Sequence, residues 1–151
     1  MDDGQPDSVN VRSPFLRELL WRGLVHQCTD LAALDDRLER GPVAAYIGFD
    51  LTATSLHAGS LVPITLLRLL QRAGHKPIVL LGGGTSKVGD PSDKDEMRQL
   101  LSDAQIAANK AGIRRVLERF LVVGDGPTDA LFADNATWLD ELGYIPFLRD
   151  V

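Results

Sequence analysis

Apolar residues recur at helical spacing in two stretches near the start of the chain. Residues 13–23 begin with Ser-Pro and place leucines on one helical face, while residues 29–41 begin with a capping residue and end in glycine. We therefore predict a helix in each stretch. The first residues, 1–14, are interpreted as a disordered lead-in, followed by one domain at 15–151.

Two continuous apolar runs have the pattern of strands. "PVAAYIGF" (42–49) and "PIVLLGG" (77–83) are short and bounded by proline and glycine, which is typical of strands buried on both faces of a parallel sheet. Between them, residues 57–74 carry an amphipathic run as long as one crossover helix and closed by a glycine. This order predicts a βαβ unit.

The rest of the chain continues the alternation of helix and strand. The pattern predicts helices at 93–101 and 103–120, strand candidates at 121–125 and 130–135, and short helices around Trp138 and Phe147. We expect an α/β fold, a Rossmann-like parallel sheet with helices on both faces.

Composition excludes several classes of protein. With 44% hydrophobic and 25% charged residues, the 151-residue chain is long enough to bury one core. Its formal charge of −5 argues against coating nucleic acid by bulk electrostatics. Cys28 is the single cysteine and cannot form an internal disulfide. Without an apolar run of membrane-spanning length or a secretory signal, the chain is expected to be cytoplasmic, with no membrane partner.

Two unusual loops leave the predicted strands at the same edge of the sheet. "GFDLTATSLHAGS" follows the first strand and "GGGTSKVGDPSDK" follows the second. Ligands of open α/β sheets bind at the carboxyl ends of strands, where glycines let backbone approach without a Cβ. Neither loop matches the dinucleotide fingerprint or the phosphate-loop pattern. A nucleotide bound here is therefore held in another way.

Taken singly, the polar residues of these loops have simpler interpretations. A histidine at a helix start, such as His57, is more often a cap or packing residue than a catalyst. Tyr46 in a strand is more often a core residue. Asp90, Lys94 and Arg98 fall at i, i+4 and i+8, the spacing of a solvated ion-pair stripe on a helix. The occurrence of all these residues in one chain favours a functional interpretation over the simpler structural ones.

Together these residues carry a family resemblance. "YIGFD-T--SLHAGSL", followed about thirty residues later by "GGGT---GDPS-K---R", resembles the start of the catalytic domain of bacterial-type tyrosyl-tRNA synthetases, which are class I aminoacyl-tRNA synthetases. The resemblance covers nearly all of 15–151. His57-Ala58-Gly59-Ser60 stands where the class has its His-Ile-Gly-His signature. Tryptophanyl enzymes and small nucleotidylyltransferases share such an element but are not expected to have the flanking motifs.

The resemblance implies a reaction and a set of catalytic residues. A tyrosine carboxylate attacks the α-phosphate of ATP, and the tyrosyl group of the adenylate then moves to tRNA(Tyr). His57 and Thr52 match residues that hold the γ-phosphate in the transition state, and Lys94 and Arg98 match cations that close over pyrophosphate. Mg²⁺ is expected to arrive with ATP, so no dedicated protein metal site and no tightly bound cofactor are implied.

The same resemblance assigns the substrate contacts. Tyr46 matches the residue that meets the substrate phenol, and Asp90 matches the one that pairs with its ammonium group. For ATP, the implied contacts are close backbone approach at Gly48 and Asp50, a γ-phosphate donor at His57, an adenine platform at Gly59 and a ribose contact at Ser60. Leu51 departs from the family's proline and is expected to loosen the loop that presents Thr52, with its own side chain unused.

The resemblance also implies that this chain corresponds to about the first third of a synthetase. The connective region that supplies the homodimer interface, a mobile lysine-containing loop and the tRNA-binding domains are expected elsewhere. The chain alone is then expected to be inactive. Two other functions remain open: a non-catalytic Rossmann-like remnant that binds a nucleotide or acts as an interaction module, and a nucleotidylyltransferase with no preference for tyrosine.

Overall fold

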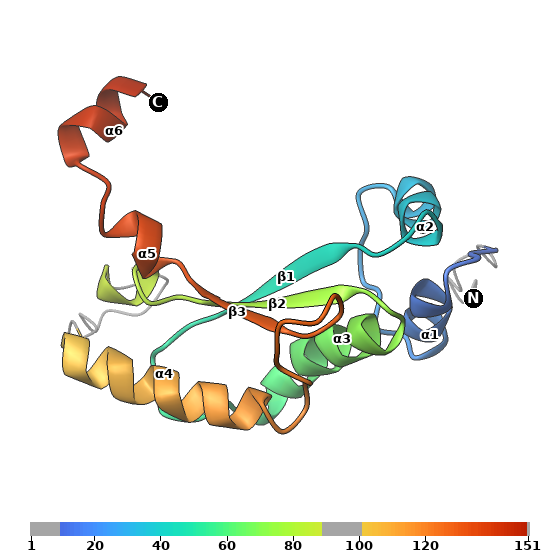
Figure 1. Ribbon diagram of the computed structural model, residues 1–151, viewed down its shortest axis with the longest axis horizontal. Helices are drawn as coiled ribbons and strands as arrows, with labels where there is room; N and C mark the ends of the chain where they lie inside the picture. Colours follow the sequence, from blue (N-terminus) through green and yellow to red (C-terminus); the bar gives the residue numbers. More distant parts are fainter. Residues whose placement is uncertain (1–9, 89–100, 151) are drawn as a thin grey trace, which may run out of the picture.

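The computed structural model describes residues 10–88 and 101–150, and Figure 1 shows how their helices and strands are arranged. In chain order, the elements are α1 (Pro14–Trp21), α2 (Leu31–Glu39), β1 (Ala44–Phe49), η1 (Ala58–Ser60), α3 (Leu61–Arg72), β2 (Lys76–Leu81), η2 (Thr85–Lys87), α4 (Asp103–Leu117), β3 (Leu131–Asp134), α5 (Ala136–Leu139) and α6 (Tyr144–Asp150). Most of the predicted helix at 93–101 lies outside the described residues.

The three strands form a parallel sheet in the order β1-β2-β3. Crossovers between parallel strands are right-handed, so two crossovers that proceed in the same direction place their helices on the same face. Accordingly, α3 and α4 both lie on one face of the sheet (Figure 1). The α/β class and the βαβ unit are confirmed, and within the described residues the two crossover helices cover one face.

The main hydrophobic core lies between the sheet and these two helices. Its strand residues alternate along β1 and β2, whereas its helix residues recur at helical spacing. The buried members are Phe49, Leu51, Ile64, Leu67, Val79, Leu81, Ile106, Ile113, Leu117, Leu121 and Ala130.

The opposite face of the sheet, here called the open face, carries the alternate strand residues. By register these are Tyr46, Gly48, Ile78, Leu80, Leu131 and Ala133. Tyr46 is 67% exposed and Leu131 is 47% exposed. The expectation that the first strand is buried on both faces is therefore wrong for β1. Its apolar run arises because one face packs into the core while Ala44, Ala45 and Gly48 are small residues on an exposed edge strand.

The strand candidate at 121–125 is also wrong, and Gln71 of α3 supplies the reason. The Gln71 amide donates to the carbonyl of Val122 at 2.7 Å and accepts the Val122 N–H at 3.0 Å. The Val122 carbonyl also accepts the Ala130 N–H at 2.8 Å, so Gln71 shares this carbonyl with the following strand and takes only the Val122 N–H away from pairing. Only an isolated bridge between Val123 and Ala130 forms, and β3 begins at Leu131.

A smaller cluster holds the first two helices together. Asp35 of α2 accepts the backbone N–H groups of Ser13, at 2.8 Å, and Arg12, at 3.1 Å. These N–H groups, with the Arg12 side chain, lower the pKa of the Asp35 carboxyl against the opposing effect of burial. The buried hydrophobic residues of this cluster are Val11, Leu16 and Leu38.

His75 joins the end of α3 to the start of β1 and makes stability depend on pH. Its Nδ1 accepts the Val43 N–H at 3.3 Å, the residue is buried, and burial together with nearby Arg37 lowers its pKa. Above pH of about 6.5 the histidine is neutral in both states. Below it, the unfolded chain takes up the proton more readily, so stability is lost as pH falls.

We expect His75→Asn, which keeps an acceptor that does not titrate, to flatten this dependence. Thermal melts of the dilute chain between about pH 7 and 5 measure it. His26→Asn is the matched control, because His26 is exposed. Equal slopes for wild type and His75→Asn would contradict the assignment.

Candidate active site

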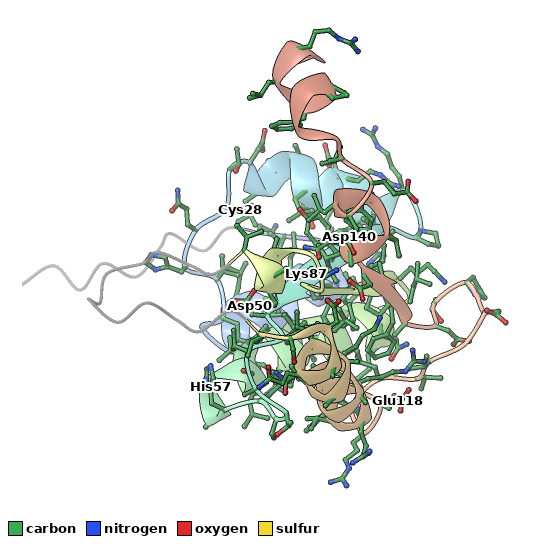
Figure 2. The ribbon with its side chains drawn as sticks, turned by 90° about the vertical axis from the view of Figure 1, so that its left-hand side faces the viewer. Cys28, Asp50, His57, Lys87, Glu118 and Asp140 are labelled. Carbon is green, nitrogen blue, oxygen red and sulfur yellow. The ribbon has the colours of Figure 1, made fainter. Side chains whose placement is uncertain are left out.

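The carboxyl ends of all three strands meet at one edge of the sheet. β1 ends beside Asp50, β2 leads into Gly82-Gly83-Gly84, and β3 ends at Asp134. Figure 2 looks onto this side of the molecule, with Asp50 and Lys87 near its centre and His57 at its lower edge. The edge predicted from the sequence is therefore where polar groups gather.

A pocket of about 330 Å³ lies at this edge, formed by the end of β1, the start of α3 and the segment between them. We call residues 50–57 the pocket loop. The pocket is lined by Gly48, Phe49, Asp50, Thr52, Ala53, Ser55, Leu56, His57, Gly59, Ser60 and Pro63. All five residues expected at ATP, together with Thr52, line this one cavity.

His57 stands where the pocket loop turns into η1. Its backbone carbonyl accepts the Ser60 N–H at 2.9 Å, but its side chain makes no capping hydrogen bond and is exposed. The imidazole folds back over Gly59, where an added Cβ would lie 2.9 Å from His57 Cε1. The simpler interpretations of His57, as a side-chain cap or a packing residue, do not fit this placement.

Tyr46 lies on the open face, two residues before Gly48, and does not line the pocket. At 67% exposure its side chain is not a core residue. Residues two apart on a strand share a face, so Tyr46 and Gly48 present to the same side of the sheet. Asp90, Lys94 and Arg98 lie outside the described residues.

The triple glycine serves a different purpose from the expected one. A Cβ on Gly83 would lie 2.2 Å from Asp134 Oδ1, and a Cβ on Gly84 would lie 3.0 Å from Leu139. All three glycines are buried. The missing side chains at 83 and 84 therefore admit the protein's own β3–α5 connection, and the expectation that they admit a ligand is wrong for these two positions.

Leu51 corrects a second expectation. Its side chain is fully buried, at 0% exposure, in the main core. The prediction that this side chain is unused is therefore wrong: it anchors the pocket loop. Because Asp50 and Thr52 flank this anchor and line the pocket, burying Leu51 fixes where both of them start.

Asp134 and Lys110 were not predicted as site residues. Lys110 Nζ of α4 lies 2.5 Å from Asp134 Oδ2. Burial disfavours the Asp134 carboxylate, but hydrogen bonds from Lys110 and from the N–H groups of Ala136 and Gly83 outweigh it, so its pKa is lowered. A signal was present, since Asp134 ends a predicted strand at the edge already chosen.

Two further polar residues tie the connection after β2 to neighbouring elements. Asn135 accepts the Gly84 N–H at 2.8 Å and donates to Thr85 Oγ1 at 3.2 Å. Lys87 pairs with Asp140 at 2.6 Å, and this hydrogen bond raises the pKa of Lys87. Figure 2 shows Lys87 and Asp140 side by side. Sequence reasoning gave neither residue a role, because their partners lie about 50 positions away.

No group of three metal-ligating side chains occurs among residues 10–88 and 101–150. In the same ranges, the helices are too short or too polar to cross a bilayer. The pocket itself contributes one carboxylate, Asp50.

Comparison with known proteins places the chain in a class. Residues 38–151 match the family model described as tRNA synthetases class I (W and Y), and the chain belongs to this family. Within it, the chain is similar to proteins named tyrosine–tRNA ligase: 62% identical to that of Zymomonas mobilis over 95% of this chain and 35% of the relative, and 60% identical to that of Rhodospirillum rubrum over 92% and 33%.

Solved structures agree with this placement. A C-terminally truncated mitochondrial tyrosyl-tRNA synthetase of Coccidioides posadasii superposes with a TM-score of 0.71 and 30% identity, covering 89% of this chain and 39% of that one. The Aspergillus nidulans counterpart gives 0.69 and 27%. The fold and the family resemblance are confirmed. The chain spans about a third of the length of its curated relatives.

Proposed function

We propose that this chain is the N-terminal part of the catalytic domain of a tyrosine–tRNA ligase. One observation carries the proposal: every ATP-site residue expected from the resemblance lines the same pocket at the carboxyl edge of a parallel sheet. The similarity to proteins named tyrosine–tRNA ligase supports tyrosine as the amino-acid substrate. The whole protein would then act in the cytoplasm, as a homodimer, on tyrosine, ATP and tRNA(Tyr).

In this proposal catalysis depends on position and charge, without a protein nucleophile. The tyrosine carboxylate attacks the α-phosphorus of ATP, and the bond to the pyrophosphate oxygen breaks. His57 and Thr52 would donate hydrogen bonds to the γ-phosphate as negative charge grows on pyrophosphate. Their exposure in the pocket, with no side-chain cap made by His57, supports that use. Lys94 and Arg98 are proposed, from the resemblance, as the cations that close over pyrophosphate.

The amino-acid half of the site is proposed from the resemblance. Tyr46 would meet the substrate phenol and Asp90 its ammonium group. Tyr46 lies on the same sheet face as Gly48, and this placement supports the proposal. A substrate tyrosine lying over the open face would reach both the Tyr46 hydroxyl and the nucleotide. Mg²⁺ bound to the ATP phosphates would neutralise part of their charge.

The test uses a full-length tyrosyl-tRNA synthetase whose matching N-terminal third is replaced by this chain, here called the graft. We expect tyrosine-dependent exchange of labelled pyrophosphate into ATP. We also expect Tyr46→Phe to raise the KM for tyrosine by about 5- to 10-fold, the effect of one lost hydrogen bond, and to erode selectivity over phenylalanine. Trp21→Phe is the matched control, since Trp21 is exposed at the far end of α1.

The outcomes separate the three functions. Exchange that does not depend on tyrosine would favour a nucleotidylyltransferase. A folded graft with no exchange would favour the non-catalytic remnant. Retained selectivity in Tyr46→Phe would remove Tyr46 from the substrate site.

A further inference from the structure

The pocket loop is held by more than the anchor of Leu51. The Leu51 N–H donates to Ser86 Oγ at 3.1 Å, and the Leu51 carbonyl accepts from Asn109 Nδ2 at 2.7 Å in a buried contact. Ser86 belongs to η2 and Asn109 to α4, so two elements distant in sequence grip a single residue of the loop.

Asn109 makes its contact with the Leu51 carbonyl from a buried position on α4. It is 7% exposed, and it sits among the apolar residues of α4 that face the core. A buried amide needs a hydrogen-bond partner, and the Leu51 carbonyl supplies one. The same carbonyl lacks a partner within a strand or helix, because Leu51 lies past the end of β1. Each group therefore satisfies the other.

Gly112 adds a third point of contact, three residues further along the same face of α4. A Cβ on Gly112 would lie 2.0 Å from the carbonyl oxygen of Thr54 in the pocket loop. Glycine is unfavourable inside a helix relative to alanine, so helix stability does not explain it. Close approach of the helix to the loop does.

We propose that Ser86 and Asn109, with Gly112, are positioning residues that fix the pocket loop through Leu51 and Thr54 and thereby set the places of Asp50, Thr52 and His57. The inference rests on the proposed function for its catalytic consequence. In a reaction without a protein nucleophile, a displacement of about 1 Å in the donors can cost 10²-fold in rate. Ser86 and Asn109 would act indirectly: they bind Leu51, and the pocket loop then places the donors of Thr52 and His57.

We expect Ser86→Ala and Asn109→Asp in the graft each to slow adenylate formation by about 10- to 100-fold, with the KM for tyrosine little changed. Asp at 109 keeps the size of Asn but has no N–H to donate. Ser86→Thr retains the hydroxyl and is expected to restore a rate close to wild type. A loss in Ser86→Thr equal to that in Ser86→Ala would contradict the hydrogen bond as the cause.

Leu51→Pro supplies a sharper test, because proline has no N–H to donate to Ser86. In a Leu51→Pro background, Ser86→Ala should cause no further loss. If Ser86→Ala lowers the rate by the same factor in both backgrounds, the proposal is overturned. Gly112→Ala, which favours the helix itself, is expected to lower the rate as well, and an unchanged rate would remove Gly112 from the set.

Hydrogen exchange at the Leu51 amide separates this inference from the proposed function. Ser86→Ala should speed that exchange whether or not the graft forms an adenylate, whereas Ser86→Thr should not. Unchanged exchange in Ser86→Ala overturns the positioning role. Faster exchange in a graft without tyrosine-dependent activity would instead overturn the proposed function and leave the loop contact standing.

Discussion

In the graft, His57→Ala is expected to slow adenylate formation by about 10²- to 10³-fold, the scale of losing one preorganised donor to developing charge. The affinity for tyrosine should hardly change, because His57 lies at the start of η1, on the nucleotide side of the pocket loop. Single-turnover kinetics of adenylate formation, with tyrosine affinity measured separately, check both halves of the expectation.

His26→Ala is the matched control, since His26 is exposed and lies outside the pocket. It should leave the rate unchanged. If His57→Ala weakened tyrosine binding and left the rate of adenylate formation intact, His57 would have no transition-state role. Equal losses in both variants would indicate damage to the fold.

The purified 151-residue chain is expected to show no tyrosine-dependent exchange and no charging of tRNA. Among the described residues, the pocket is lined only by the end of β1, the pocket loop and the start of α3. Ground-state binding should survive better than turnover, which needs complementarity to the transition state. With each exposed polar contact worth about 1 kcal/mol, tyrosine affinity is expected to be millimolar at best.

The same chain is expected to self-associate through the open face. Tyr46 and Leu131 are exposed there, β1 lies at the sheet edge, and α6 extends away from the sheet with Phe147 and Leu148 largely exposed (Figure 1). Sedimentation over a dilution series measures this. Leu131→Lys should weaken association by about tenfold or more, whereas Trp21→Lys, at an exposed site on α1, should not.

A monodisperse chain with measurable exchange would contradict both expectations. It would show that a chain spanning about a third of its relatives' length already holds a working adenylation site.

The sequence was sufficient where the determining interactions are local. Ser13, Asp30 and Ser102 cap α1, α2 and α4 within three residues, so the starts of these helices can be predicted from short stretches. The pocket follows almost as directly, because its lining comes from one continuous segment, Gly48 to Pro63. A strand end, a glycine and a helix start suffice to place it.

What the sequence did not disclose depends on partners far along the chain. Gln71 takes the Val122 N–H from across 51 positions, and Asn109 reaches Leu51 across 58. The sequence around a polar helix residue does not indicate which distant loop supplies its hydrogen-bond acceptor. The role of Leu51 was misjudged for the same reason: its burial depends on α3 and α4 packing on the same face of the sheet.

The division of buried apolar residues into two clusters has a consequence for how the protein unfolds. Among the described residues, the cluster of α1 and α2 buries three hydrophobic side chains, whereas the main core buries eleven. A unit with so little buried surface opens at a smaller free-energy cost than the sheet. Its detachment would also uncover Val43, which packs against this cluster just before β1. Unfolding would thus proceed in stages from the amino-terminal end, and a single midpoint would describe only the last of them.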